Sequence, residues 1–94
     1  MRPLFATLTD KGGVFLREKV FVEVYALFDT EGNITPLSIV WSDGMTYQID
    51  KVLDCRRAAS LKAGGMGMRY TIRIKNNITY LYYEKPRWFV EGKK

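Results

Sequence analysis

The tripeptide Ser42-Asp43-Gly44 lies between two apolar segments, residues 34–41 and 45–52, and restricts the fold more than any other feature. A two-residue turn at this point would place polar side chains opposite apolar ones. A three-residue turn, with Gly44 left-handed at a bulge, instead gives one continuous apolar face. This register pairs Trp41 with Met45, Ile39 with Tyr47 and Leu37 with Ile49. The sequence therefore predicts an antiparallel hairpin over residues 34–52.

Other segments show the same strand pattern. Residues 19–28 alternate, and one of their faces is apolar, formed by Val20, Val22, Val24, Ala26 and Phe28. Residues 69–75 and 78–84 predict a second hairpin around an Asn76-Asn77 turn, and residues 87–91 a short final strand. Residues 54–68 contain three glycines and break the pattern, so we expect a long basic loop there. The predicted class is all-β: five to six short antiparallel strands in a meander that forms a small SH3-like barrel or a strongly bent sheet.

The chain has the length of one domain, with 94 residues of which 47% are hydrophobic. We expect an N-terminal arm or short first strand at 1–18, a single β-barrel domain at 19–91, and a frayed tail at 92–94. The first residues hold no apolar run of signal-peptide length, and the chain has a single cysteine. These features predict a cytoplasmic protein.

Catalytic and metal chemistry have little support in the residue types. The chain contains no histidine, which is the commonest general base and the commonest metal ligand. Cys55 precedes Arg56 and Arg57, which would favour its thiolate, but no histidine is present to act as its base. Trp41 and Trp88 lie in apolar segments and are predicted to be core residues. We therefore expect a protein that is not an enzyme and that binds no metal and no cofactor.

Positive charge is concentrated in the second half of the chain. Residues 1–50 carry 4 basic and 7 acidic side chains, whereas residues 51–94 carry 11 basic and 3 acidic ones. Such asymmetry favours a polyanionic partner.

Part of this positive charge lies on one face of the predicted hairpin over residues 69–84. Pairing its strands places Arg69, Thr71, Arg73 and Lys75 beside Ile78, Tyr80, Tyr82 and Glu84 on the face opposite the core. Cations that bind phosphates, next to rings that stack on bases, are what a single-stranded nucleic-acid binder requires. The predicted binding residues are Arg69, Arg73, Lys75, Tyr80 and Tyr82, flanked by Arg56, Arg57 and Lys62. An ordinary cross-strand pairing explains the same pattern, and so does packing of both tyrosines beneath the loop or the N-terminal arm.

The run Leu37-Ser38-Ile39-Val40-Trp41-Ser42-Asp43-Gly44-Met45-Thr46-Tyr47-Gln48-Ile49-Asp50-Lys51-Val52 carries a resemblance, together with Arg69-Tyr70-Thr71 and Arg87-Trp88-Phe89-Val90-Glu91. Over roughly residues 19–91 the chain resembles a family of small uncharacterised bacterial proteins, chiefly from Firmicutes. The resemblance implies a compact cytoplasmic β domain and transfers no binding or catalytic residue. The likeness to SH3-like barrels is an analogy of fold.

Two functions remain open from the sequence. The first is a non-enzymatic module that binds single-stranded nucleic acid or another polyanion through the basic and aromatic strand face. The alternative is a module for protein–protein interaction or self-association that uses an exposed sheet edge, at residues 19–28 or 87–91. Neither function involves a membrane.

Overall fold

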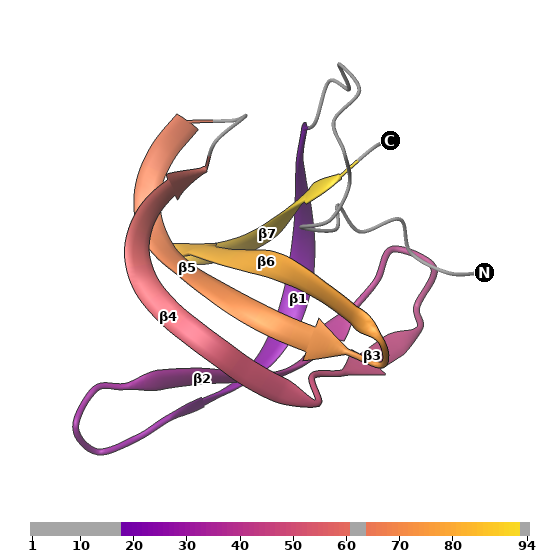
Figure 1. Cartoon of the computed structure of the whole chain (residues 1–94), viewed down its shortest axis with the longest axis horizontal. Coiled ribbons are helices and arrows are strands. Elements are labelled where there is room, and N and C mark those ends of the chain that lie inside the picture. Colours follow the sequence, from indigo (N-terminus) through magenta and orange to yellow (C-terminus); the bar gives the residue numbers. More distant parts are fainter. Residues whose placement is uncertain (1–17, 61–63, 93–94) are drawn as a thin grey trace.

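The computed structural model describes residues 18–60 and 64–92, and all the regular structure in them is β-strand. The prediction of an all-β fold is confirmed, although the sheet has seven strands and not five or six. Figure 1 shows that the sheet curls into a half-barrel. The strands are β1 (Glu18–Phe28), β2 (Ile34–Val40), β3 (Thr46–Gln48), β4 (Lys51–Ser60), β5 (Gly64–Ile74), β6 (Asn77–Glu84) and β7 (Arg87–Gly92).

The sheet joins two antiparallel meanders, β1 to β3 and β4 to β7, through the pairing of β1 with β7. The spatial order is β3-β2-β1-β7-β6-β5-β4, so β3 and β4 form its two edges. The strands over residues 19–28 and 87–91 are β1 and β7, and each has a neighbour on both sides. The expectation that one of them is an open edge is therefore wrong. The free edges lie elsewhere because the first and last strands pair with each other.

The hairpin around residues 42–44 has the predicted register. Ile39 pairs with Tyr47, and the amide of Trp41 donates a hydrogen bond of 2.8 Å to the carbonyl of Met45. Gly44 has a φ of 86°, a left-handed conformation that glycine adopts at little cost. The carboxylate of Asp43 also accepts a hydrogen bond of 2.8 Å from the Met45 amide, which closes the turn.

One face of the sheet holds the main hydrophobic core, and we call it the inner face. Seven buried side chains form its centre: Ile39, Tyr70, Ile72, Ile74, Leu81, Trp88 and Val90. Val20, Val22, Val24 and Ala26 pack against this centre, as their alternation predicts, whereas Phe28 is 61% exposed. Trp41 also packs against the core, which confirms the prediction for both tryptophans.

The prediction of a long loop over residues 54–68 is wrong. Most of this segment belongs to β4 and β5, which pair with each other from Lys51 and Arg73 onward. The glycines suggested a loop, but Gly67 has a packing role: a Cβ at this position would overlap the carbonyl oxygen of Tyr83 on the neighbouring β6. A glycine in a strand can mark such a close approach of two backbones.

The turn between β5 and β6 lies one residue earlier than predicted, at Lys75 and Asn76. Lys75 adopts a φ of 55°, and its amide donates a hydrogen bond of 2.7 Å to the carboxylate of Asp50. The Asp50 amide in turn donates to the carbonyl of Arg73 at 2.8 Å. This link from the β3–β4 corner holds the turn in place. The pairing shifts by two residues, so the side chains of β5 and β6 stay on their predicted faces, whereas Lys75 becomes a turn residue.

Candidate nucleic-acid interface

The face opposite the core, which we call the outer face, carries the predicted binding residues of β4, β5 and β6 in cross-strand rows. Residues paired across antiparallel strands point to the same side of a sheet, so the register defines these rows. One row contains Arg56, Arg69 and Tyr82; the next contains Asp54, Thr71 and Tyr80; the third contains Lys51, Arg73 and Ile78. The outer face therefore brings together cations from two neighbouring strands and tyrosines from a third.

Arg69 and Tyr80 form the central contact of this surface. The guanidinium carbon of Arg69 lies 4.2 Å from the centre of the Tyr80 ring, a cation–π geometry. Both side chains are half-buried. The Nε atom of Arg69 is buried and has no hydrogen-bond partner in the part of the chain that the structure describes. Tyr80 also contacts Tyr82 edge-on, with the ring centres 6.1 Å apart.

Arg56 is paired with an acidic neighbour on its own strand. Its Nε atom lies 2.8 Å from Oδ2 of Asp54, and a second guanidinium nitrogen lies 3.3 Å from Oδ1. Hydrogen bonding to Arg56 lowers the pKa of the Asp54 carboxyl, and the pair raises the pKa of the Arg56 guanidinium. Both groups are solvated, so the pair is easily exchanged for another anion.

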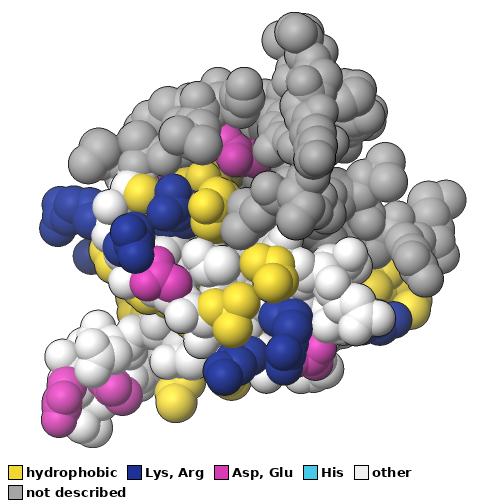
Figure 2. All heavy atoms as spheres, viewed as in Figure 1, with side chains coloured by type: hydrophobic (Ala, Val, Ile, Leu, Met, Phe, Trp, Pro, Cys, Tyr) yellow, Lys and Arg dark blue, Asp and Glu magenta, His cyan; other side chains and the backbone are white. Residues whose placement is uncertain are grey.

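Lys51, Arg73 and Lys75 are exposed, and none of them forms an ion pair with a described residue. Figure 2 shows Lys and Arg side chains in two groups, one over the curled end of β4 and β5 and one near the start of β4, with hydrophobic side chains between them. We call Lys51, Arg56, Arg69, Arg73 and Tyr80, together with Lys75 in the adjoining β5–β6 turn, the outer basic face.

Tyr82 does not offer its ring to a ligand. The side chain is 1% exposed and stacks on Phe89, with ring centres 5.0 Å apart and an interplanar angle of 5°. Phe89 packs in turn against Phe21 of β1. Burial raises the pKa of Tyr82 to about 12. Tyr82 is thus a packing residue that contacts Tyr80. The sequence left open that this ring packs beneath the loop or the N-terminal arm, but in the structure it stacks on Phe89 of β7.

Two members of the predicted flank are not part of this surface. Arg57 pairs with Met68 and faces the inner side of the sheet, because a β-bulge between Val52 and Asp54 changes the alternation of β4. Lys62 lies outside the described residues. The sequence analysis also missed Lys51, the first residue of β4, whose side chain shares a row with Arg73. The sequence predicts one strand over residues 45–52, whereas in the structure β3 ends at Gln48 and β4 begins at Lys51.

The thiol of Cys55 is not activated by the arginines that follow it. Partial burial raises its pKa, which disfavours the thiolate. Within residues 18–60 and 64–92, no cluster of three or more Cys, Asp or Glu residues could hold a metal ion. The same residues include no helix with the length and apolar character needed to cross a membrane.

Comparison of the chain with protein-family models, with curated proteins and with solved structures gives no match. The resemblance to a family of small bacterial proteins therefore stays a prediction. The function has to be argued from the geometry of the surface.

Proposed function

We propose that this protein is a non-enzymatic module that binds single-stranded nucleic acid through the outer basic face. The observation that supports it most is the contact between Arg69 and Tyr80, because it places a guanidinium plane and an aromatic ring at the centre of a group of cations. The exposed ammonium and guanidinium groups of Lys51, Arg73 and Lys75 have no carboxylate partner among the described residues, whereas Arg56 pairs with Asp54. Such groups bind phosphates without regard to base sequence.

The same geometry favours a single strand over a duplex. Stacking on Tyr80 or on the Arg69 guanidinium requires an unpaired base, and such stacking contributes about 1–3 kcal/mol per base. Because Tyr82 is buried, the surface offers stacking for one base at most, and phosphate contacts supply the rest of the affinity. Binding is therefore tolerant of sequence and sensitive to salt. A curled antiparallel sheet of this kind fits the SH3-like barrel class that we propose for the fold, and a cytoplasmic location fits such a ligand.

Fluorescence anisotropy with labelled oligothymidylate and oligouridylate tests the proposal. The test variant carries Lys51→Gln with Arg73→Gln, two exposed positions on the outer face. A matched variant carries Arg57→Gln with Lys85→Gln, which removes the same two residue types from exposed positions elsewhere. The first pair is expected to weaken binding strongly and the second to leave it nearly unchanged. Absence of binding by the unaltered protein at low salt would refute the proposed function.

A further inference from the structure

A cavity of about 430 Å³ lies on the inner side of the half-barrel, away from the outer basic face. Its walls come from two parts of the fold. The turn after β1 and the start of β2 form one wall, and the inner face of β4 and β5 forms the other. The lining residues are Gly32, Asn33, Ile34, Thr35, Val52, Cys55, Met68 and Tyr70. We call this cavity the β4 groove. Its lining is mostly apolar, with a few polar groups, as is usual for binding pockets.

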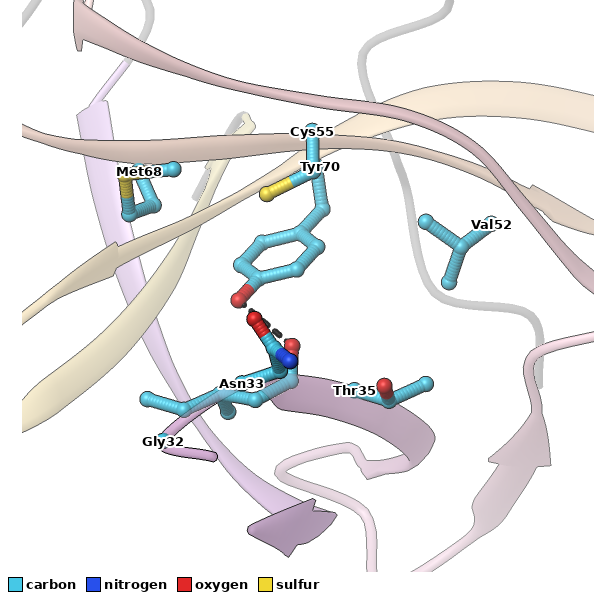
Figure 3. Close-up of a pocket in the computed structure, with 8 residues that line it drawn as sticks. Gly32, Asn33, Thr35, Val52, Cys55, Met68 and Tyr70 are labelled. Atoms are coloured by element: carbon cyan, nitrogen blue, oxygen red, sulfur yellow. Dashed lines mark hydrogen bonds between the residues drawn. The ribbon is translucent and has the colours of Figure 1, made fainter. Parts of the chain in front are cut away.

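One hydrogen bond spans the β4 groove. The hydroxyl of Tyr70 donates to the carbonyl of Ile34 at 2.7 Å and so links β5 to the start of β2. Figure 3 shows the Tyr70 ring reaching from the side of Cys55 toward the turn that contains Asn33. This contact fixes the spacing between the two walls without filling the space beside them.

The strand that borders the groove is an edge of the sheet. No described strand pairs with the side of β4 that faces away from β5. An edge strand of 10 residues presents a row of backbone donors and acceptors, which is the usual template for strand addition. The edge and the groove are adjacent, because Val52 and Cys55 belong to both.

The cationic side chain of Arg57 lies on this edge strand, two residues after the groove residue Cys55. Arg57 is exposed, faces the same side of the sheet as Cys55, and forms no ion pair with a described residue. In a strand, residues two apart share a face. An added strand would therefore place one side chain in the groove and, two positions along, another against the Arg57 guanidinium.

We propose that the edge of β4 binds an extended acidic segment of another protein by strand addition. The segment carries an apolar residue that enters the β4 groove and, two positions away, a carboxylate that pairs with Arg57. Backbone hydrogen bonds to β4 supply sequence-independent affinity, and these two side chains supply specificity.

The chain itself does not provide such a segment among its described residues. We call a triplet with an apolar first residue and an acidic third residue a step. Each step among the described residues either lies in a strand paired on both sides or has a carboxylate that already accepts a hydrogen bond. The steps are Phe21 to Glu23, Leu27 to Asp29, Trp41 to Asp43, Val52 to Asp54, Tyr82 to Glu84 and Phe89 to Glu91. Within residues 18–60 and 64–92, no such step is free to bind a second copy of the chain.

The test uses a synthetic eight-residue peptide of alternating threonine and valine that contains one leucine-threonine-glutamate step. A control peptide has lysine in place of the glutamate, and a second control has proline in place of the central threonine. Titration of ¹⁵N-labelled protein is expected to shift the amide signals of β4 and of residues 32–35, and to leave those of β7 unchanged. The proline peptide is expected to cause no such shifts, because proline cannot complete the ladder.

The role of Arg57 is tested by charge reversal. Arg57→Glu is expected to weaken the glutamate peptide about fivefold, as for a solvated ion pair, and to favour the lysine peptide instead. Arg57→Glu is expected to bind oligothymidylate normally, so failure of this proposal is distinguishable from failure of the proposed function. Equal binding of both peptides by Arg57→Glu would overturn the pairing.

A second measurement does not depend on substitution. Cys55 is the chain's single cysteine, and it lines the groove. Bound glutamate peptide is expected to slow alkylation of Cys55 by N-ethylmaleimide at least fivefold, and the alkylated protein is expected to bind no peptide. Unchanged alkylation at saturating peptide, shifts confined to the outer face, or dimerisation without peptide binding would each overturn the proposal.

Discussion

Replacement of Lys51 and Arg73 by glutamine removes two exposed cations from one row of the outer basic face. Four cations of this face have no carboxylate partner in the described part of the chain: Lys51, Arg69, Arg73 and Lys75. For single strands, the logarithm of the binding constant falls with the logarithm of the salt concentration with a slope of about −0.7 per phosphate contacted. Four contacts give a slope of about −2.8, and the two left in the variant give about −1.4.

These slopes predict a large difference between the two proteins in how much affinity they lose as the salt concentration rises. Between about 50 mM and about 200 mM salt, the unaltered protein is expected to lose about fiftyfold in affinity for oligothymidylate, and the double variant about sevenfold. Anisotropy titrations at four or five salt concentrations give both slopes directly. Circular dichroism of the variants checks that the fold is intact.

Two results would refute this reasoning. Equal slopes for the double variant and the unaltered protein would mean that phosphates are bound elsewhere. A similar decrease in the variant carrying Arg57→Gln with Lys85→Gln would mean that binding follows net charge and not this face. In the expected case, only substitutions on the outer face change the slope.

Three further predictions concern single positions. Tyr80→Ala is expected to weaken oligothymidylate binding by about 1–3 kcal/mol with an unchanged salt slope, and a steeper or flatter slope would argue against stacking. Gly67→Ala forces β5 away from the Tyr83 carbonyl and is expected to cost about 1–3 kcal/mol in a urea unfolding titration, whereas an unchanged midpoint would contradict the close approach. The pKa of Tyr82 rises to about 12 in the folded protein, against about 10 when unfolded, so the stability it contributes is present below about pH 10 and is lost as the pH rises toward 12. Tyrosinate absorbance and urea unfolding at stepped pH check this, and a flat stability profile over that range would contradict it.

The parts of the fold that follow from local chemistry were predictable from the sequence. The hairpin register depends on Asp43, on the left-handed Gly44 and on apolar alternation, all of which are visible in the sequence. Alternation also assigned the faces of β1, β5 and β6. The faces of β5 and β6 were predicted correctly although the position of the turn between them was wrong. A shift of two residues preserves the period of a strand.

Several errors involve contacts between segments distant in the sequence. The turn at Lys75 depends on a hydrogen bond to Asp50, which is 25 residues away. In the sequence Gly67 indicates a loop, and its close approach to the Tyr83 carbonyl is visible only in the structure. The pairing of β1 with β7 buries both predicted edges, and no local pattern specifies it. The burial of Tyr82 has a more local origin, since its ring stacks on Phe89 of β7, the next strand along the chain.

The orientation of the two arginines of β4 could not be predicted from the sequence. Strict alternation from Lys51 would place Arg57 outside and Arg56 inside, whereas the structure has the reverse. The cause is Leu53, an extra residue at a β-bulge and 42% exposed, which shifts the alternation of everything that follows in β4. One residue thus decides which arginine faces the outer surface and which faces the groove.

Deletion of Leu53 separates the two binding surfaces. A strand without the extra residue keeps Asp54 and Arg56 on the outer face and Cys55 on the inner face, because the deletion restores strict alternation around them. It also removes the local bend that a bulge produces, so β4 should straighten and the groove beside Cys55 should widen. The deletion variant is expected to bind oligothymidylate within about twofold of the unaltered protein and to bind the glutamate peptide at least fivefold more weakly. Equal loss of both ligands, in a variant with an intact circular dichroism spectrum, would mean that the two faces of β4 do not act independently.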